Sequence, residues 1–449
     1  MIVMKFGGTS LADAERIASA SEIVRARLAQ RPVVVLSAMA GVTDLLVEAV
    51  SAARRDDRDT VDRAVGELAK RHRWAVAGTM HGSSSRHDLD LEVDATLEEL
   101  RLLLRSVRVL GEGTPRAADT LLSFGELLCT RIATAAFVER GVPARWTDPR
   151  EVVITDGRHG AAEPQLHAMA ERCRTRLVPM VAAGEVPVIG GFVGCSTDGV
   201  TTTLGRGGGD TSAAALGAAL GASEIQIWTD VDGLMTADPR AVAGARRLPS
   251  VSFAEAAELA YYGARVLHPA SIAPAVKRNI PVRVLNSLDP EGPGTVILDR
   301  AEPSAPPLAS VTCRRGARAM RVGGKDLRAD AAFLPRVLGV FEANGATPDV
   351  VVASEVAVTV VVSGLDFEKV ARDLAAFASL ETVADLAIVC VVGSGLASDG
   401  AIRRRVLEAL AAHEPVALGL GARATSVAAA VSEGRLESAV RDIHHRFFE

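Results

Sequence analysis

The sequence predicts an α/β protein in which a mostly parallel sheet is covered by helices on both faces, followed by two small ferredoxin-like units. Three observations lead to this prediction. Strand-like and helix-like segments alternate as far as residue 298, which is typical of a parallel sheet. Three prolines then fall within residues 303–307, as in a linker. Beyond them the order strand-helix-strand-strand-helix occurs twice, over roughly 70 residues each time.

The first elements of the chain surround a glycine turn. "IVMKF" (2–6) is expected to be a buried strand, "GGTS" a turn, and residues 11–29 a helix. The run "PVVVLSAM" (32–39) is almost continuously apolar, which indicates a second strand buried on both faces. A helix is expected from Thr43 onward.

Later segments continue the alternation. Helices are expected at 89–110, 115–140, 210–221, 253–263 and 269–278, and strands at 186–194, 224–229, 281–285 and 295–298. After the linker, strands are expected at 309–313, 349–354, 357–363, 386–393, 415–421 and 425–432, and helices at 331–344, 366–377, 400–412 and 434–446. The expected domains are 1–299, a linker at 300–307, and small domains at 308–380 and 381–449; the strand at 308–313 is open to assignment to the second small domain.

Composition excludes several classes of protein. The 449 residues are too many for one ordinary domain, and the formal net charge of -5 argues against a nucleic-acid partner. The arginines at 314–315 and 403–405 are interpreted as solvated surface. Five scattered cysteines without CxxC spacing indicate free thiols in a reducing compartment. No signal peptide is recognised and no continuous apolar run reaches about 18 residues. We therefore expect a cytoplasmic protein without a membrane span.

The first motif is the glycine turn after the first strand. Lys5 lies near the end of that strand, and Gly7-Gly8-Thr9-Ser10 lead into the next element. Bare backbone N–H groups at a helix start attract anions, and a lysine adds a mobile positive charge for phosphate oxygens. The motif is not a Walker A loop, because no GK[ST] follows the glycines. Taken alone, a plain turn is the more frequent explanation.

The second motif, "TTTLGRGGGD" (201–210), is more specific. Four glycines surround Arg206, and an alanine-rich helix follows that Asp210 or Thr211 is expected to cap. A backbone with so few side chains can wrap closely around a ligand. A flexible loop is the alternative, but such a loop needs neither the arginine nor a sharp helix start.

The third motif is "WTDVDGLMTADPR" (228–240), which follows a strand. Asp230, Asp232 and Asp238 suit Mg²⁺ or a ribose, and Arg240 suits phosphate; turn-forming aspartates are an equally frequent alternative. Two glycine-rich cradles with a lysine and an arginine on one parallel sheet suggest phosphoryl transfer by positioning and charge neutralisation.

Together these motifs resemble the aspartate kinase family, within the wider amino-acid kinase fold. "KFGGTS", "VLSAMAGVTDLL", "SFGEL", "TTTLGRGGGD", "WTDVDGLMTADPR" and "GARVLHP" match that family's motifs in order and approximate spacing. The small units after Pro307 resemble its paired ACT regulatory domains, and "SEVAV" and the ending "HHRFFE" resemble its single-function, lysine-sensitive branch.

The resemblance implies transfer of the ATP γ-phosphate to the side-chain carboxylate of L-aspartate, giving 4-phospho-L-aspartate. Lys5 would neutralise the phosphoryl group in flight, and Asp210 would orient the positive groups of the site. Arg206 would hold the substrate α-carboxylate, Glu126 its ammonium, and Thr43 would also contact the substrate. Without the family, Glu126 would be interpreted as a helix-surface acid and Thr43 as a helix cap.

The resemblance also implies nucleotide and effector sites. Phosphate would lie on Gly7, Gly8, Thr9 and Ser10, and the rest of the nucleotide would be lined by Thr229, Asp230, Met235, Arg240 and Arg265. Mg²⁺ would be held largely by the nucleotide phosphates. An amino-acid effector, with lysine the first guess, would contact Asp349, Ser354 and Glu355. A homodimer or larger assembly is expected. Arg265 as a helix-end charge is the alternative for that residue.

Three positions depart from the family's usual motifs. Gly209 stands where a serine is usual, Met235 where a tyrosine is common, and Arg265 where a lysine is usual. None of these changes removes a principal charge. Two alternatives stay open: another amino-acid kinase, acting on glutamate or an acetylated amino acid, and a non-catalytic amino-acid sensor. The pairing of Arg206 with Glu126 favours a free α-amino acid as substrate.

Overall fold

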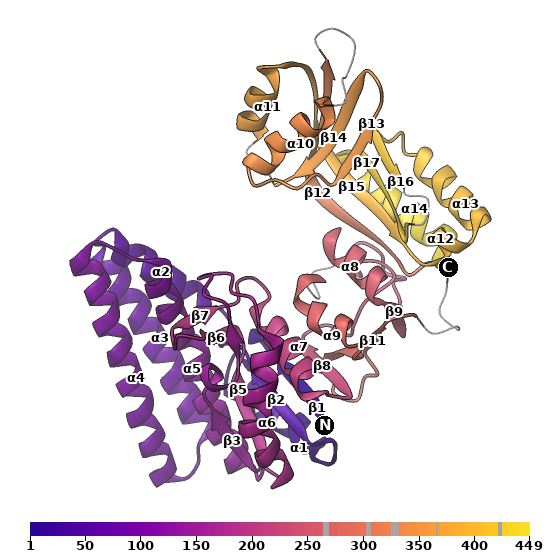
Figure 1. Ribbon diagram of the computed structural model, residues 1–449. Helices are drawn as coiled ribbons and strands as arrows, with labels where there is room; N and C mark the ends of the chain where they lie inside the picture. The colour runs from indigo at the N-terminus through magenta and orange to yellow at the C-terminus, as the bar shows by residue number, and fades with distance from the viewer. Residues whose placement is uncertain (264–268, 302–306, 325–331, 365–366, 421–423) are drawn as a thin grey trace. The chain divides into compact units, whose positions relative to one another are not determined.

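A computed structural model describes residues 1–263, 269–301, 307–324, 332–364, 367–420 and 424–449 (Figure 1). The chain divides into two compact units, and each is described here by itself. The first comprises residues 1–233 and 267–299, and the second residues 234–266 and 300–449. Residues 234–266 thus group with the C-terminal part of the chain. The domain boundaries expected from the sequence remain predictions.

The first unit is built on a mostly parallel sheet. Its strands run in the order β3-β5-β2-β1-β8-β10-β11, and only β10 and β11 pair antiparallel. The bounds are β1 Ile2–Phe6, β2 Pro32–Leu36, β3 Ala144–Thr147, β5 Val186–Gly190, β8 Glu224–Thr229, β10 Val282–Asn286 and β11 Thr295–Leu298. After β1 the chain builds outward through β2, and it later returns to add β8 on the other side of β1. Ligands of such sheets bind at the carboxyl ends of the strands beside this reversal.

Helices complete the first unit. They are α1 Ala14–Arg25, α2 Val42–Arg54, α3 Arg58–Thr79, α4 Ser83–Leu110, α5 Pro115–Glu139, α6 Leu166–Ala182, α7 Gly208–Leu220 and α9 Ala273–Lys277, with short 3₁₀ turns at Gly8–Leu11, Leu28–Gln30, Pro149–Glu151 and Pro269–Ile272. The long helices α3, α4 and α5 stand side by side in Figure 1. A small second sheet joins β4 Ile154–Thr155, β6 Val193–Ser196 and β7 Thr201–Thr203.

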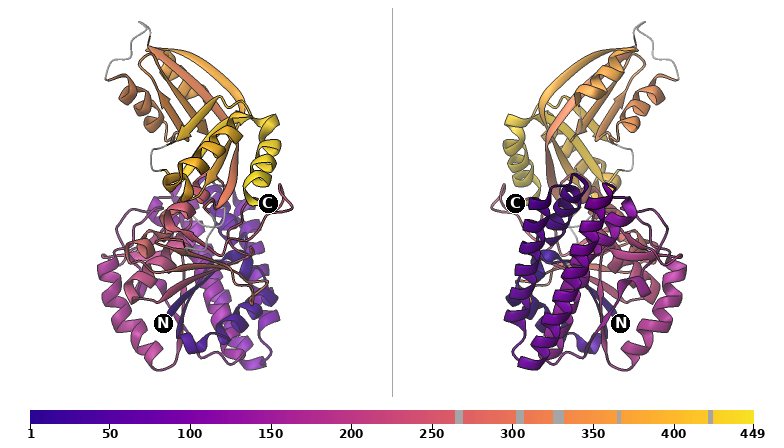
Figure 2. Two further views of the ribbon diagram at one scale, coloured as in Figure 1. Left: turned by 90° about the vertical axis from the view of Figure 1, so that its right-hand side faces the viewer. Right: turned by 90° about the vertical axis from the view of Figure 1, so that its left-hand side faces the viewer.

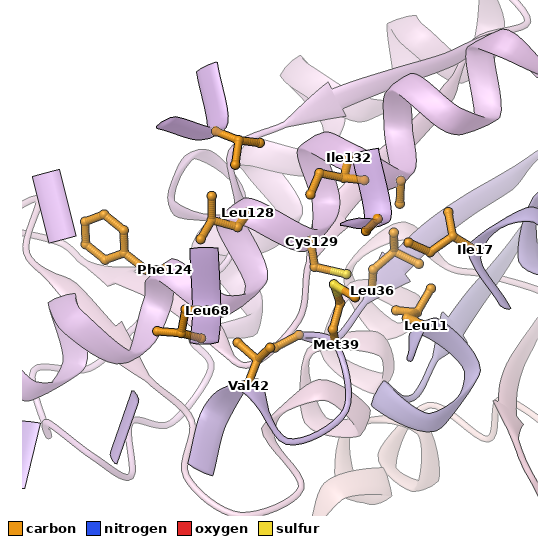
Figure 3. Close-up of a cluster of buried hydrophobic side chains, with 14 of the residues drawn as sticks. Leu11, Ile17, Leu36, Met39, Val42, Leu68, Phe124, Leu128, Cys129 and Ile132 are labelled. Carbon is orange, nitrogen blue, oxygen red and sulfur yellow. The ribbon is translucent and has the colours of Figure 1, made fainter. Parts of the chain in front are cut away.

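The alternation of side chains along β1 separates the two faces of the main sheet. Met4 and Phe6 are fully buried and belong to the core that α5 covers. Figure 3 shows part of this core, where the sulfur atoms of Met39 and Cys129 face one another. Because successive strand residues point to opposite faces, Lys5 lies on the other face, which α7 covers. The strand therefore delivers Lys5 to the start of α7.

Helix α5 is the one helix among the described residues that is long and apolar enough to cross a membrane. Of its most apolar stretch, 78% is buried inside the structure. Helix α5 is therefore a core helix of the first unit, and its apolar character reflects packing against the sheet and against α4.

The second unit contains a six-stranded antiparallel sheet in the order β13-β14-β12-β15-β17-β16. Its bounds are β12 Ser310–Gly324, β13 Val350–Ala353, β14 Ala357–Ser363, β15 Ala378–Val392, β16 Ala417–Leu420 and β17 Ser426–Ser432. The first residues of β12, 310–314, pair with 388–392, and its later residues pair with both β14 and 378–386. Strands β12 and β15 thus run through the whole sheet, and each is far longer than the sequence predicted.

Two helix pairs cover this sheet. The unit contains β9 Ser250–Ser252, α8 Phe253–Tyr261, α10 Phe333–Ala343, α11 Phe367–Ala375, α12 Gly395–Ser398, α13 Gly400–Ala411, a 3₁₀ turn Glu433–Arg435 and α14 Leu436–Phe448. Helices α10 and α11 pack over one core and α13 and α14 over another, as the orange and yellow helices of Figure 2 show. This antiparallel, ACT-like region confirms the predicted fold class.

Several elements were not predicted. The sequence analysis placed no helix at α6 and no strand at β3, β4 or β7. Two helix starts were also placed wrongly. Helix α7 begins at Gly208 after Gly207 as N-cap, so neither Asp210 nor Thr211 caps it. Helix α2 begins after Gly41, so Thr43 lies inside the first turn and is not the N-cap.

Candidate active site

Lys5 and Asp210 form the centre of the site. The Lys5 ammonium lies 2.7 Å from Asp210 Oδ1, and the two side chains are 12% and 14% exposed. Lys5 is the last residue but one of β1, while Asp210 lies in the first turn of α7, where the helix dipole favours a negative charge. Both side chains are thus mostly buried, and Asp210 holds the ammonium in position.

The glycines around Arg206 shape the loop before α7. Gly205 and Gly207 have φ of +70° and +72°, a region that side-chain-bearing residues rarely adopt. Arg206 lies between them and is exposed. Gly209 has a different role: a Cβ there would lie 2.9 Å from Ser37 Oγ and 3.2 Å from Lys5 Cε. The absence of a side chain at 209 therefore leaves room for Lys5.

Glu126 is buried, which rules out the helix-surface interpretation. It is 3% exposed on α5, and its Oε1 accepts a hydrogen bond of 3.2 Å from the Ala38 backbone N–H. Its Oε2 has no hydrogen-bond partner among the described residues. Burial raises the pKa of Glu126 to about 8, against the lowering effect of the Ala38 hydrogen bond. A buried carboxylate with a free oxygen is suited to a cationic ligand.

The turn after β2 connects Glu126 to the rest of the site. The contact between Ala38 and Glu126 could not be predicted from the sequence, since a backbone N–H leaves no residue signature. Gly125 allows α5 to approach this turn closely, because a Cβ at position 125 would lie only 3.0 Å from the Ala38 Cβ. The Arg71 guanidinium on α3 donates to the Ala40 carbonyl, which holds the turn in place. Thr43 follows this turn and is partly exposed.

In the glycine turn after β1, some residues bond to neighbouring strands and others are accessible to a ligand. Gly7 N–H donates to the Trp228 carbonyl, and the buried Ser10 hydroxyl lies 2.8 Å from the Ser287 hydroxyl. These two groups thus join the turn to neighbouring strands. Thr9 is exposed, and a Cβ on Gly8 would lie 3.0 Å from the Ala38 carbonyl oxygen. Of the predicted phosphate-binding residues, Thr9 has the most accessible side chain.

The residues predicted for the nucleotide belong to both units. Thr229 is the last residue of β8 in the first unit, and the exposed Asp230 follows it. The Thr229 hydroxyl donates to Asp230 Oδ1 over 3.1 Å. Met235 and Arg240 belong to the second unit. Arg240 is 90% exposed, and its guanidinium donates hydrogen bonds to both carboxylate oxygens of Asp238. Arg265 lies outside the described residues.

The predicted effector residues lie in the second unit and mostly have partners. The Asp349 side chain is 1% exposed, and its Oδ1 accepts a hydrogen bond of 2.7 Å from Arg314. Ser354 bonds to the backbone of Ala357 at the turn between β13 and β14, and Glu355 is exposed. The interpretation of Arg314 as solvated surface is wrong, because the guanidinium pairs with this buried carboxylate and stacks on Tyr261.

The described part of the chain contains no group of three or more His, Cys, Asp or Glu side chains that could hold a metal ion. The five cysteines are free thiols, four of them buried, in agreement with the sequence analysis.

Comparison with known proteins places these features in a family. The model of the amino acid kinase family matches residues 1–286. The lysine-sensitive aspartokinase 3 of Escherichia coli is 33% identical over the whole of this chain and 99% of its own length. The chloroplastic aspartokinase 1 of Arabidopsis thaliana is 34% identical over the whole chain and 80% of its length.

Two crystal structures of the Escherichia coli enzyme share the fold along the whole chain. Aspartokinase III in complex with lysine and aspartate, described as the T-state, has a TM-score of 0.87 at 32% identity. The same enzyme with aspartate and ADP, the R-state, has a TM-score of 0.84 at 32% identity. Each comparison covers 100% of both chains.

Proposed function

This chain belongs to the aspartokinase family and is an allosterically regulated aspartate kinase, and from that premise we propose that phosphoryl transfer takes place at Lys5 and Asp210. The observation that carries the assignment is their 2.7 Å ion pair where β1 ends and α7 begins. One oxygen of the substrate side-chain carboxylate attacks the γ-phosphorus of ATP, the bond to the bridging oxygen breaks, and ADP leaves. No general base is needed, because the attacking carboxylate is already ionised.

Lys5 supplies the positive charge for this step. Charge on the transferring phosphoryl group is spread over its oxygens, and a positioned cation stabilises it. Asp210 keeps the ammonium at the strand end rather than acting on the substrate. Gly209 allows the lysine to lie there without a steric clash.

Glu126, Arg206 and Thr43 bind the amino acid. The free Oε2 of Glu126 accepts the α-ammonium group, which neutralises a buried carboxylate. The exposed Arg206 holds the α-carboxylate through two parallel hydrogen bonds, and Thr43 adds a hydroxyl from the start of α2.

ATP lies along the carboxyl edge of the sheet. The turn from Gly7 to Ser10 binds phosphate, and Thr229 with Asp230 lines the rest of the nucleotide in the first unit. Met235, Arg240 and Arg265 complete the nucleotide site as the family implies. Mg²⁺ enters with the nucleotide and is held mainly by its phosphates.

The second unit carries the regulation. Escherichia coli aspartokinase III has been crystallised with lysine, and we propose that an amino acid, with lysine the first choice, binds here at Asp349, Ser354 and Glu355. The buried Asp349 Oδ2 has no hydrogen-bond partner among the described residues and suits an ammonium group.

For the domains, we propose that the catalytic domain comprises residues 1–299 and that a linker and ACT domains at 308–380 and 381–449 follow it. We expect a cytoplasmic homodimer that catalyses the first step of aspartate-family amino-acid biosynthesis.

The test is ATP-dependent formation of an acyl phosphate, trapped with hydroxylamine. L-aspartate, L-glutamate and N-acetylglutamate serve as acceptors, each with and without lysine or threonine. Hydroxamate from L-aspartate alone, reduced by lysine, supports the proposal. Turnover with glutamate instead would point to another amino-acid kinase, and thermal stabilisation by an amino acid without any turnover would point to a sensor.

A further inference from the structure

Asp119 is a buried carboxylate for which the site described so far has no role. Its side chain is 1% exposed on α5, and both oxygens accept hydrogen bonds. Oδ1 accepts from the Thr203 hydroxyl and from Gly160 N–H, and Oδ2 lies 2.6 Å from His159 Nδ1. Because an ionised carboxylate can only accept, Nδ1 of His159 carries the proton. Donors to a buried charge make stronger bonds than donors to a neutral group.

These donors come from two segments that border the arginine loop. Thr203 ends β7, three residues before Arg206. The turn at 159–160 lies directly against the same loop, since a Cβ on Gly205 would be 2.9 Å from the Gly160 carbonyl oxygen. A backbone hydrogen bond from Ala162 N–H to the Thr203 carbonyl joins the two segments again.

Helix α5 carries both Asp119 and Glu126. The two residues are seven positions apart, about two helical turns or about 10 Å along the axis, and they share one face. Glu126 is fixed directly by the helix and by the Ala38 N–H. The loop of Arg206 is fixed to the same helix through Asp119. Helix α5 thereby sets the spacing between the Glu126 carboxylate and the Arg206 guanidinium.

We propose that Asp119 is a positioning residue for substrate recognition, acting through Thr203, Gly160 and His159. It holds Arg206 at the distance from Glu126 that matches the α-carboxylate and α-ammonium of one amino acid. This clamp, formed by Asp119, Thr203, His159 and Gly160, shares no hydrogen bond or ion pair with Lys5 or Asp210 among those of the described residues. Loosening it should therefore weaken the binding of aspartate and leave the phosphoryl-transfer step and the binding of ATP almost unchanged. The inference rests on the proposed roles of Arg206 and Glu126.

The test compares two substitutions at one position. Thr203→Val removes the hydroxyl at nearly constant volume, and Thr203→Ser retains it. Loss of a hydrogen bond to a buried charge corresponds to about a 10- to 100-fold change in an equilibrium. We expect Thr203→Val and Asp119→Asn to raise the KM for aspartate by about that factor, while kcat and the KM for ATP stay within about threefold. Thr203→Ser should restore the aspartate KM.

Asp156→Asn is the matched control. Asp156 accepts hydrogen bonds from Arg158 and Glu163 within the segment 156–163, which also contains His159 and Gly160. Its side chain is 29% exposed, however, and neither of these hydrogen bonds involves Thr203. Its KM for aspartate should equal that of the wild type. If Asp119→Asn fails to fold, as judged by its thermal unfolding, the pair of substitutions at Thr203 decides alone.

Two outcomes overturn the inference, and they differ. An unchanged aspartate KM in Thr203→Val, or a parallel loss of kcat and ATP affinity, contradicts a positioning role for Asp119. Arg206→Ala is measured alongside. If that variant also keeps the wild-type KM for aspartate, the proposed role of Arg206 is wrong and the clamp loses its purpose. If Arg206→Ala raises the KM and Thr203→Val does not, only the clamp is wrong.

Discussion

At the scale of single residues, the proposed contact between Glu126 and the substrate ammonium makes substrate binding depend on pH. Burial raises the pKa of this carboxyl to about 8, so in the free enzyme it holds a proton at neutral pH. The substrate ammonium needs the ionised form, and binding below the raised pKa must therefore release that proton. Sequence comparison alone would have suggested an ordinary ionised glutamate.

We predict that the KM for aspartate falls as pH rises from about 6.5 to about 8, by up to about tenfold per pH unit. The KM for ATP should change much less over the same range, because Glu126 does not contact the nucleotide in this account. Steady-state kinetics at fixed ionic strength measures both values. A pH-independent aspartate KM would contradict the assignment of Glu126 to the ammonium.

The same carboxyl affects the stability of the fold. Its pKa is raised in the folded state, so the unfolded chain loses this proton first, near the ordinary glutamate pKa. The folded protein then loses stability as pH rises from about 4.5 to about 8. Glu126→Gln removes this dependence, and its free energy of unfolding should exceed that of the wild type by more at pH 8 than at pH 5. Urea unfolding at the two pH values measures the difference.

Gly209 matters through the space it leaves. A methyl group at 209 would lie 2.9 Å from Ser37 Oγ and 3.2 Å from Lys5 Cε, so one of the two side chains must move. We predict that Gly209→Ala lowers kcat by about tenfold or more, since small displacements of a charged group are costly in phosphoryl transfer. Adding Ser37→Ala relieves one of the contacts and should recover part of the rate.

The control for this prediction is Gly157→Ala. Gly157 has no atom within 4 Å of an added Cβ, and it lies outside the site. Its kcat should match the wild type. A Gly209→Ala variant as active as the wild type would show that Lys5 tolerates the crowding and that its observed position is not required.

Side chains in the site differed in how predictable they were. Lys5, Arg206 and Asp210 follow from motifs in which charges stand beside glycines. The importance of Glu126 could be inferred only from the family resemblance, because burial is not visible in the letters "SFGE". Asp119 was missed, although an acid seven residues before Glu126 on an apolar helix is a usable signal. Arg314 was misinterpreted because its buried partner lies 35 residues away.

At the scale of elements, the long strands of the second unit explain both a success and a failure. The first part of β12, next to the linker, and the last part of β15 are apolar, and both were predicted as strands. Their other halves, 317–324 and 378–385, both carry charges, the first also carries glycines, and neither was predicted. Cross-strand pairing stabilises these halves, since β12 pairs with β14 and β15 at the same time. Such pairing has no local signature in the sequence.

The Arg314–Asp349 pair connects β12 to the segment before β13, and its two members should not be equivalent. Asp349 is 1% exposed and Arg314 is 31% exposed. Arg314→Met leaves a buried carboxylate without its cation, whereas Asp349→Asn leaves an arginine that water can reach. We predict that Arg314→Met destabilises the second unit by about 1–3 kcal/mol, more than Asp349→Asn does.

Urea unfolding of both variants measures this difference. Arg315→Met is the control: its side chain is 55% exposed and pairs with Glu433 and Glu437 on the surface, so the expected change is about 0–1 kcal/mol. A larger loss for Asp349→Asn than for Arg314→Met would contradict the view that the buried carboxylate is the costly member.

At the scale of the whole molecule, the alternation of strands and helices was enough to predict the fold class. Parallel sheets bury both faces, and their strands are therefore easily recognised as apolar runs. Helix α6 escaped because its apolar residues are few and Pro179 lies inside it. Its buried Met169, Cys173, Leu177 and Val181 nonetheless recur every fourth residue, a helical pattern that could have been recognised.

The similarity to Escherichia coli aspartokinase III extends along the whole chain and includes the regulatory region. The motifs that allowed recognition are concentrated in the first unit. The proposed effector site accordingly rests on Asp349, Ser354 and Glu355, and the proposed catalytic site rests on the charges around Lys5.

The most direct test of the central claim is the initial rate of aspartyl phosphate formation by Lys5→Ala, with Mg²⁺, ATP and L-aspartate at saturation and the product trapped as hydroxamate. Thermal stabilisation by aspartate is recorded in the same samples, to show that the substrate still binds. We predict a rate at least about 10²-fold below the wild type with binding retained, because the cation opposite the transferring phosphoryl group is gone. A rate close to that of the wild type would contradict the account.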